Sequence, residues 1–247
     1  MPGGRGSGPE EEPMEAQPTS VLVVGGSLVG LSAAVFMAWR GGPTVLVERH
    51  PGSSPHPRAI GFTPRTIELF RAVGLGRRIP QVPSGTRRPR RVRVESLARE
   101  WFEETPWAPE EPEVLEIEYS PCRGAALAQD RLEPILRERA VELGADIRLE
   151  TELVGFEQDA DGVTAWLRGR DGDEYALRAA YLVAADGHRS PVREALGIGR
   201  ARRGHLRTGR SVLFCAPLEE YLRTGIRQFS IDQPGFDAFL TTYSDGR

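Results

Sequence analysis

A short run of small residues between two apolar segments constrains this 247-residue chain more than any other feature. The segment before it, Val21–Val24, has no polar side chain, which is typical of a strand buried on both faces. The run itself contains Gly25, Gly26, Ser27 and Gly30. Small residues let the backbone approach a phosphate group, and the amides at the start of a helix can bind it. The run therefore predicts a phosphate site between a strand and a helix.

An acidic residue further along extends this pattern. Residues 31–40 predict a helix that ends at residues 41–43, which are Gly, Gly and Pro. Thr44–Val47 predict a second strand, and Glu48 stands at its end, about 18 residues after Gly30. An acid near this spacing accepts hydrogen bonds from the hydroxyls of an adenosine ribose. Strand, turn, helix, strand and acid in this order predict a dinucleotide site.

Two other interpretations share these residues. Ser27 stands where the dinucleotide pattern has its middle glycine, so the run could be an ordinary strand-to-helix turn with Glu48 as a solvated strand end. Because all the elements occur in register, nucleotide binding is favoured. The uncharged segment Val21–Trp39 could also suggest a membrane span. Glycine and serine interrupt it early, and acidic residues precede it, so we expect neither a span nor a signal peptide.

Composition limits the class of protein. The length suits one large domain or one and a half, and the net charge of −3 argues against general nucleic-acid binding. The arginine-rich run 77–93 has no aromatic residue between its arginines to stack on bases. Cys122 and Cys215 suggest no disulfide framework, which fits a reducing cytoplasm, and we expect a cytoplasmic protein. The first 18 residues predict a disordered tail.

The middle of the chain alternates helices and strands. Thr63 and Pro64 predict the start of a helix, and a second helix follows Asp130. Two strands, 92–97 and 114–119, are expected to pair with each other. Three short strands at 153–157, 163–169 and 174–179, joined by Asp-Gly turns, predict a β-meander. A separate buried strand from Tyr181 leads to Asp186, and strands are expected at 211–216, 226–232 and 238–243.

Three polar residues are candidates for ligand binding only because of the segments around them. Arg58 follows the nucleotide-binding unit and could reach a pyrophosphate, although a lone arginine is more often a surface residue. Gln129 precedes the second predicted helix and alone would be an ordinary loop amide. Asp186, at the carboxyl end of a predicted strand, points into the crevice in which α/β sheets bind ligands.

Four motifs, in this order, resemble a known family. They are Val24–Leu31, Glu48-Arg49, Pro57-Arg58-Ala59 and Asp186-Gly187-x-x-Ser190-x-x-Arg193. Together they resemble the FAD-dependent aromatic hydroxylases related to para-hydroxybenzoate hydroxylase. Segments 48–54 and 211–247 resemble most the members that hydroxylate aromatic polyketides of the anthracycline and tetracenomycin type. The resemblance runs from about Val21 to Arg247, and the Asp-Gly motif is its most specific part.

The resemblance implies an α/β fold with a Rossmann-like FAD-binding domain of the glutathione-reductase type and a β-meander. We expect this domain to be discontinuous, over residues 19–90 and 120–200. An antiparallel excursion is expected at 91–119. Residues 201–247 are expected to begin an antiparallel substrate-binding domain.

The resemblance also implies FAD and NADPH as cofactors. Contact with FAD is implied for Gly25, Gly26, Ser27, Gly30, Glu48, Arg49, Arg58, Gln129, Asp186 and Gly187. The glycine run would face the pyrophosphate, Glu48 the adenosine ribose and Arg49 the adenine. Asp186 and Gly187 would serve both FAD and NADPH.

The implied reaction hydroxylates an aromatic polyketide or another phenolic substrate. NADPH reduces the flavin, oxygen adds to give a flavin C4a-hydroperoxide, and one oxygen atom passes to an electron-rich ring. The chemistry belongs to the cofactor, while the protein orients and shields it. No side chain stands out as an acid or base, so no catalytic residue is assigned, and no metal is expected.

Length separates this chain from the family pattern. Family members are much longer, and a Gly-Asp motif in their later half contacts the flavin, whereas Gly172-Asp173 here lies in a predicted turn. We therefore expect the chain to match the N-terminal half of a hydroxylase. The alternative is a non-catalytic remnant, or one half of an enzyme that needs a partner chain. The sequence leaves open whether the protein forms a homo-oligomer.

Two further classes are less favoured. Another flavoenzyme of the same architecture, such as a reductase or halogenase, is disfavoured by the substrate strands expected after Ser211. A plain NAD-dependent dehydrogenase is disfavoured by the antiparallel excursion and the Asp-Gly motif. Neither nucleic acid nor a membrane is an expected partner.

Overall fold

The computed structural model describes residues 17–56, 58–83, 90–98, 101–104, 119–201, 203–205, 208–222 and 225–242. The chain divides into two compact units. The first comprises Met1–Ser54 and Glu133–Ala201, and the second comprises Pro55–Leu132 and Arg202–Arg247.

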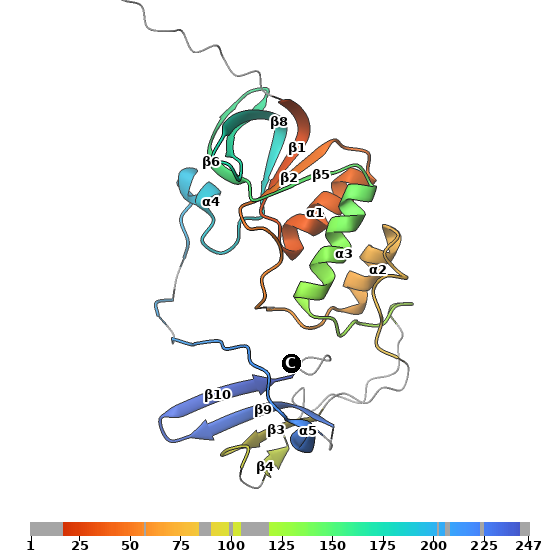
Figure 1. Cartoon of the computed structure of the whole chain (residues 1–247), viewed down its shortest axis with the longest axis vertical. Helices are drawn as coiled ribbons and strands as arrows, with labels where there is room; N and C mark the ends of the chain where they lie inside the picture. The colour runs from red at the N-terminus through yellow and green to blue at the C-terminus, as the bar shows by residue number, and fades with distance from the viewer. Residues whose placement is uncertain are drawn as a thin grey trace, which may run out of the picture. The chain divides into compact units, whose positions relative to one another are not determined.

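A six-stranded sheet forms the centre of the first unit (Figure 1). Its strand order is β5-β2-β1-β8-β7-β6. The strands are β1 (Gln17–Val24), β2 (Thr44–Glu48), β5 (Asp146–Leu149), β6 (Glu152–Asp159), β7 (Gly162–Arg168) and β8 (Glu174–Ala184). The pairs β5-β2, β2-β1 and β1-β8 are parallel, whereas β8-β7 and β7-β6 are antiparallel. The predicted β-meander is therefore continuous with the parallel sheet.

Strand β8 joins the two parts of this sheet. It runs without a break for 11 residues and pairs with β1 along one edge and with β7 along the other. The prediction of two separate strands, with a buried one from Tyr181, was wrong on both points, because Tyr181 lies in the same strand and is 71% exposed. Pairing on both edges keeps the strand extended where the sequence pattern alone suggested a break.

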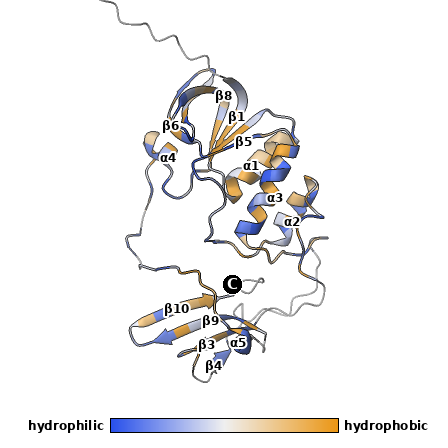
Figure 2. Cartoon of the chain, in the orientation of Figure 1, coloured by the Kyte–Doolittle hydropathy of each residue, from blue (hydrophilic) through white to orange (hydrophobic). Residues whose placement is uncertain are grey.

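The sheet curls so that the meander covers one face of β1 and β2. Strands β6 and β2 contact each other although they are not neighbours in the sheet. One apolar core results from this curl: Leu22, Val24, Val45, Val47, Ala165, Leu167, Leu177 and Ala179. Figure 2 shows apolar residues, in orange, along the central strands β1 and β2. Each fully buried aliphatic side chain contributes about 1.5–3 kcal/mol to stability.

Helix α1 (Leu28–Trp39) contacts β1 and β2, and its residues Leu31, Ala34 and Val35 are fully buried. Helix α3 (Gln129–Glu142) buries Leu132, Leu136 and Ala140, whose spacing of four residues places them on one face of the helix. A short helix α4 (Pro191–Ala195) follows the Asp-Gly loop.

The second unit contains a four-stranded mixed sheet of order β10-β9-β3-β4. Its strands are β3 (Arg90–Val94), β4 (Trp101–Glu104), β9 (Ile226–Gln233) and β10 (Phe236–Thr241). Strands β9 and β10 pair antiparallel, as expected, whereas β3 pairs with β9 in parallel. The segments predicted as an excursion and as a second domain therefore share one sheet. The core of this sheet is made of Val92, Val94, Ile226 and Phe229.

The other elements predicted for this unit can be compared with the structure one by one. Helix α2 (Pro64–Ala72) begins as predicted, with the Thr63 side chain accepting a hydrogen bond from the Thr66 amide. The strand predicted at 211–216 was wrong, because these residues form no regular element, and a short helix α5 (Glu219–Leu222) follows instead. The partner strand predicted at 114–119 lies, except for Tyr119, outside the described residues. Residues 1–16 of the predicted N-terminal tail also lie outside them, whereas Gln17 and Pro18 were wrongly assigned to the tail and are the first residues of β1.

No helix among the described residues is long and apolar enough to cross a membrane. The apolar segment Val21–Trp39 instead forms part of β1, the glycine turn and α1.

Candidate functional site

The turn between β1 and α1 is too tight for side chains at its glycines. Gly25 has a φ of +107°, and a methyl group there would lie 2.4 Å from the carbonyl oxygen of Ala185. A methyl group on Gly30 would lie 1.8 Å from the carbonyl oxygen of Gly25. At Gly26 the clash would be with the Cβ atom of Glu48, at 2.6 Å. The sequence pattern is therefore required by backbone packing as well as by any ligand.

The start of α1 has the properties of an anion site. Ser27 occupies the N-cap position with an extended backbone, and no acidic residue lies in the first turn of α1. The first amides of a helix have no acceptor within the helix, and the helix dipole makes this end positive. The α1 N-terminus therefore offers N–H donors and a favourable potential to a negatively charged group.

Glu48 lies directly against this turn. Its Oε2 atom accepts a 2.6 Å hydrogen bond from the Gly26 amide, and its Oε1 atom accepts from the His50 amide at 2.9 Å. The Nδ1 atom of His50 lies 2.5 Å from Oε1, and the Glu48 side chain is only 14% exposed. The carboxylate is thus fixed at the end of β2, beside the turn, as the sequence predicted.

The environment keeps Glu48 ionised. Burial alone would raise the pKa of Glu48, but the hydrogen bonds from Gly26 and His50 outweigh burial and hold the pKa below its usual value of 4.5. A carboxylate can accept about four hydrogen bonds, so acceptor capacity is left on Oε2 for a hydroxyl group.

The Asp186-Gly187 loop reaches the same place from β8. The Ala185 amide donates to the carbonyl oxygen of Val24 at 2.8 Å, and the Asp186 amide nitrogen would lie 3.1 Å from a methyl group on Gly25. The Asp186 side chain accepts from the Val192 amide at 3.1 Å. The loop also contains Ser190, a non-glycine residue with a φ of +22°. The first unit thus brings the glycine turn, Glu48 and the Asp-Gly loop together.

Arg58 and Gln129 meet within the second unit. The Oε1 atom of Gln129 accepts from the Arg58 amide at 3.1 Å, and the Gln129 amide donates to the Ala59 carbonyl at 2.9 Å. These bonds fix Gln129 at the first position of α3. Arg49, the remaining predicted residue, is exposed just after β2.

Two residues of the site escaped sequence reasoning. Glu133 is only 2% exposed, and its Oε1 atom accepts a 2.7 Å hydrogen bond from the Ser27 hydroxyl. Acids are common in the first turn of a helix, so no signal in the sequence marked Glu133 as buried. His50, which contacts Glu48, carried no signal either.

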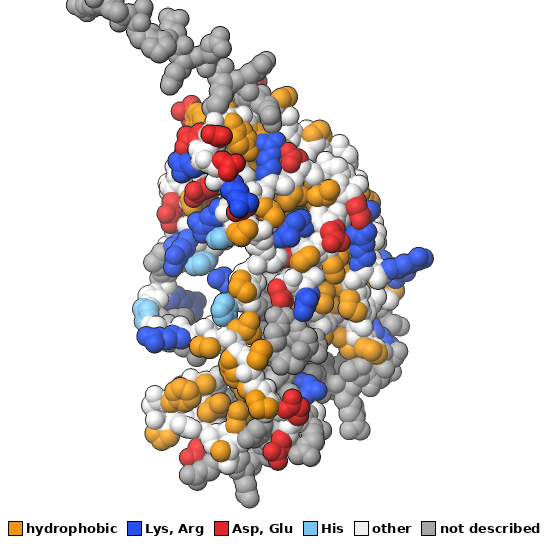
Figure 3. Space-filling model, in the orientation of Figure 1, with side chains coloured by type: hydrophobic (Ala, Val, Ile, Leu, Met, Phe, Trp, Pro, Cys, Tyr) orange, Lys and Arg blue, Asp and Glu red, His pale blue; other side chains and the backbone are white. Residues whose placement is uncertain are grey.

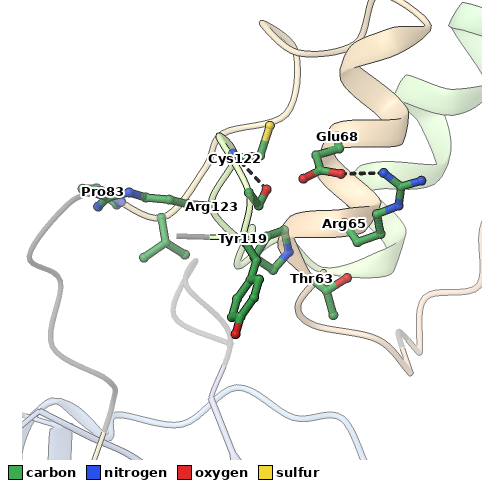
Figure 4. Close-up of a pocket in the computed structure, with 11 residues that line it drawn as sticks. Thr63, Arg65, Glu68, Pro83, Tyr119, Cys122 and Arg123 are labelled. Atoms are coloured by element: carbon green, nitrogen blue, oxygen red, sulfur yellow. Dashed lines mark hydrogen bonds and ion pairs between the residues drawn. The ribbon is translucent and has the colours of Figure 1, made fainter. Parts of the chain in front are cut away.

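A cavity of about 830 Å³ lies elsewhere, in the second unit (Figure 4). It is lined by the start of α2, by two residues of the loop after α2 and by the segment before α3: Thr63, Pro64, Arg65, Glu68, Val82, Pro83, Tyr119, Ser120, Cys122, Arg123 and Gly124. Glu68 and Arg65 form an ion pair of 2.6 Å at its wall. None of the ten predicted site residues lines this cavity, so we assign it no ligand.

Charges on the first unit occur largely as pairs. Figure 3 shows acidic and basic side chains interspersed on the visible face of this unit. Examples are Arg178 with Asp159 at 2.6 Å and Arg168 with Glu174 at 2.7 Å. Within the described residues, no group of three or more His, Cys, Asp or Glu side chains could hold a metal ion.

The residues of the first unit fit the adenosine and pyrophosphate half of FAD. A pyrophosphate needs backbone donors without side chains in its path, which Gly25, Gly26 and Gly30 supply. A ribose needs a fixed acceptor, and Glu48 is one. The turn between β1 and α1 and the Glu48 side chain therefore have the groups that binding of FAD would require.

Comparison with known proteins agrees with this fit. The model of the family described as "FAD binding domain" matches residues 18–241. The tetracenomycin A2 monooxygenase-dioxygenase of Streptomyces glaucescens is 39% identical over 244 residues, which cover 90% of this chain and 43% of that protein. The aklavinone 12-hydroxylase of Streptomyces purpurascens is 42% identical over 219 residues, 86% of this chain and 41% of that protein.

A solved structure shows the same likeness. The chain matches the ternary complex of aklavinone-11 hydroxylase with FAD and aklavinone with a TM-score of 0.74 and 38% identity, over 92% of this chain and 44% of that chain. A RebC structure with bound 7-carboxy-K252c matches with a TM-score of 0.77 and 30% identity, over 94% of this chain and 45% of that chain. The chain thus spans less than half the length of these relatives.

Proposed function

The chain belongs to the FAD binding domain family, and from this premise we propose that it binds FAD through the glycine turn, Glu48 and the Asp-Gly loop. The observation that carries the proposal is the meeting of these three segments within one unit. They are far apart in the sequence, and each supplies a different group. Backbone amides suit the pyrophosphate, and a fixed carboxylate suits the ribose.

Other predicted residues have roles in this proposal. Arg49 lies beside the adenine, Arg58 contacts the pyrophosphate or the ribityl chain, and Gln129 also contacts FAD. Asp186 and Gly187 contact FAD and also serve NADPH. The hydrogen bonds that hold Asp186 and Gln129 support these assignments, since they fix both side chains before a ligand arrives.

We further propose that the reaction served is the hydroxylation of an aromatic polyketide. NADPH, a proton and O₂ convert a ring C–H group into C–OH, giving NADP⁺ and releasing the second oxygen atom as water. Bound FAD supplies the electron transfer and the oxygen activation. The support comes from the relatives, whose names state monooxygenase or hydroxylase activity. The part of the protein is to bind, orient and exclude water, and no catalytic residue is assigned.

The sheet of the second unit suits a role in substrate binding. We propose that residues 201–247, together with the excursion at 91–119, contribute to the aromatic-substrate site. Residues 19–90 and 120–200 then form the FAD-binding domain. The pairing of β3 with β9 supports a shared role for the two segments, because it joins the β3-β4 pair and the β9-β10 pair into one sheet.

Purified chain mixed with FAD, NADPH and a panel of phenolic polyketides tests this function. The expected result is substrate-dependent NADPH oxidation, with a product that carries one additional oxygen atom from O₂. FAD binding without NADPH oxidation would instead favour a non-catalytic chain, or one that requires a partner chain. That alternative is favoured by one observation, that the chain spans less than half the length of its relatives. A chain that binds no FAD would contradict both the monooxygenase proposal and this alternative.

A further inference from the structure

Ser27 occupies the one position of the glycine turn that departs from the dinucleotide pattern. The pattern places glycine there so that the backbone can approach the pyrophosphate closely. A serine at a helix N-cap normally turns its oxygen toward the amides of the first turn and accepts a hydrogen bond from one of them. Such a cap at α1 would occupy a donor that an anionic ligand needs.

The structure shows a different use of this hydroxyl. Within the described part of the chain, the Ser27 side chain makes no capping hydrogen bond to α1. Its Oγ atom instead donates to the Oε1 atom of Glu133 at 2.7 Å. The hydroxyl is therefore directed toward α3 and away from the first-turn amides of α1.

Glu133 is well suited to hold the hydroxyl in this direction. Its side chain is only 2% exposed, and Leu132 and Leu136 of the same helix are fully buried. A buried carboxylate needs hydrogen-bond donors, so its bond to Ser27 is stronger than one at an exposed site. The positive end of α1 also favours an anion at this place. The pair connects the phosphate turn to the helix that begins with Gln129.

We propose that Glu133 is a positioning residue for cofactor binding, which makes serine acceptable at the middle position of the turn. It accepts the hydroxyl of Ser27 and so keeps the first-turn amides of α1 available to the pyrophosphate. The inference rests on the proposed function, since the ligand is FAD. It extends that function, because Glu133 acts on FAD only through Ser27.

A double-mutant cycle tests the inference directly. Glu133→Leu removes the acceptor while still filling buried space, and Ser27→Gly removes the hydroxyl. Affinity for FAD is measured from the quenching of flavin fluorescence, with ADP as a competitor that carries the adenosine and the pyrophosphate but no flavin. Thermal unfolding of each apo variant, followed by circular dichroism, shows that it is folded.

The expected effects depend on whether the hydroxyl is present. Glu133→Leu alone raises the Kd for FAD about tenfold, because Ser27 turns back to cap α1. In the Ser27→Gly background the same substitution changes the Kd less than about twofold, since contacting residues are coupled. The Kd of the Ser27→Gly chain is the reference for this comparison, because that chain has no hydroxyl to cap α1. Glu133→Gln keeps an acceptor oxygen and stays close to the wild-type Kd.

Each other outcome overturns the inference. An equal loss of affinity from Glu133→Leu in both backgrounds would make Glu133 merely structural. An unchanged Kd for FAD in Glu133→Leu would show that Glu133 has no role in binding. A large loss of FAD affinity in Ser27→Gly alone would mean that the hydroxyl itself contacts FAD. Glu133→Met replaces Leu if that variant does not fold, and failure of both to fold would show a role in the fold alone. If the wild-type chain binds neither FAD nor ADP, the proposed function fails as well.

Discussion

Glu48 is the residue on which the proposed ligand depends most. Its carboxylate is held by the Gly26 and His50 amides, and its pKa lies below 4.5, so it is ionised at neutral pH. Charge-assisted hydrogen bonds to a carboxylate are about twice as strong as neutral ones. The negative charge at this point is therefore worth more to a ribose diol than an amide would be.

We predict that Glu48→Gln raises the Kd for FAD about tenfold, because the ribose then donates to a neutral amide and the Gly26 amide loses its charged acceptor. Flavin fluorescence quenching measures the change. Glu174→Gln is the matched control, since Glu174 makes only an exposed ion pair with Arg168. Equal Kd values for the two variants would show that Glu48 does not contact the cofactor.

The hydrogen bonds of Asp159 predict how its contribution to stability depends on pH. Its carboxylate accepts from Arg178 and from the Asp161 amide, and these bonds lower its pKa from 3.8 to about 2. Because the folded-state pKa is depressed, the contribution of Asp159 to stability is present above pH 3.8 and is lost as the pH falls toward 2. A carboxyl NMR titration should place its midpoint near 2.

The matched variant for this titration is Arg178→Gln. Loss of the guanidinium should move the midpoint of Asp159 up toward 3.8. A wild-type midpoint already near 3.8 would contradict the ion pair.

At the scale of elements, helix α1 fits β1 only because Gly30 has no side chain. Strand, turn and helix pack so closely that a methyl group added to Gly30 would lie 1.8 Å from the carbonyl oxygen of Gly25. The clash is between a Cβ atom, whose position the backbone fixes, and a backbone oxygen, so no side-chain rotation can relieve it.

We therefore predict that Gly30→Ala lowers the free energy of unfolding by about 3 kcal/mol, as an overpacked core position does. Urea unfolding of the apo chain measures the change. Gly42→Ala serves as the comparison, because a methyl group there would lie 3.5 Å from the Met37 carbonyl oxygen, an ordinary contact. A loss at Gly30 no larger than that at Gly42 would contradict the packing described.

Local chemistry decided which elements the sequence could predict. The glycine turn, the acid at the end of β2 and the Thr63-Pro64 start of α2 are signals within a few residues, and all three were confirmed. Segment 211–216 is apolar enough to read as a strand, but Val212 is 75% exposed there. An apolar run becomes a strand only where a partner strand is available.

Non-local contacts account for what the sequence did not predict. The parallel pairing of β3 with β9 joins segments more than a hundred residues apart, and β5 exists as a strand because it pairs with β2. The Ser27–Glu133 hydrogen bond is of the same kind. A single sequence shows residue types and spacing, whereas such contacts depend on how the whole unit packs.

At the scale of the whole molecule, a chain of the FAD binding domain family brings the glycine turn, Glu48 and the Asp-Gly loop together on a curled six-stranded sheet. A second sheet lies in the other unit, and the chain matches less than half the length of its relatives. The central claim is therefore about binding rather than turnover: the glycine turn, Glu48 and the Asp-Gly loop together hold FAD.

Titration of FAD into the purified chain, followed by calorimetry, tests this claim most directly. We predict saturable one-to-one binding with a Kd of about 1 µM or below, which corresponds to about −8 kcal/mol. ADP should compete with FAD, because it carries the pyrophosphate and the ribose, whereas riboflavin should not. The absence of saturable heat, or binding that ADP does not weaken, would contradict the account.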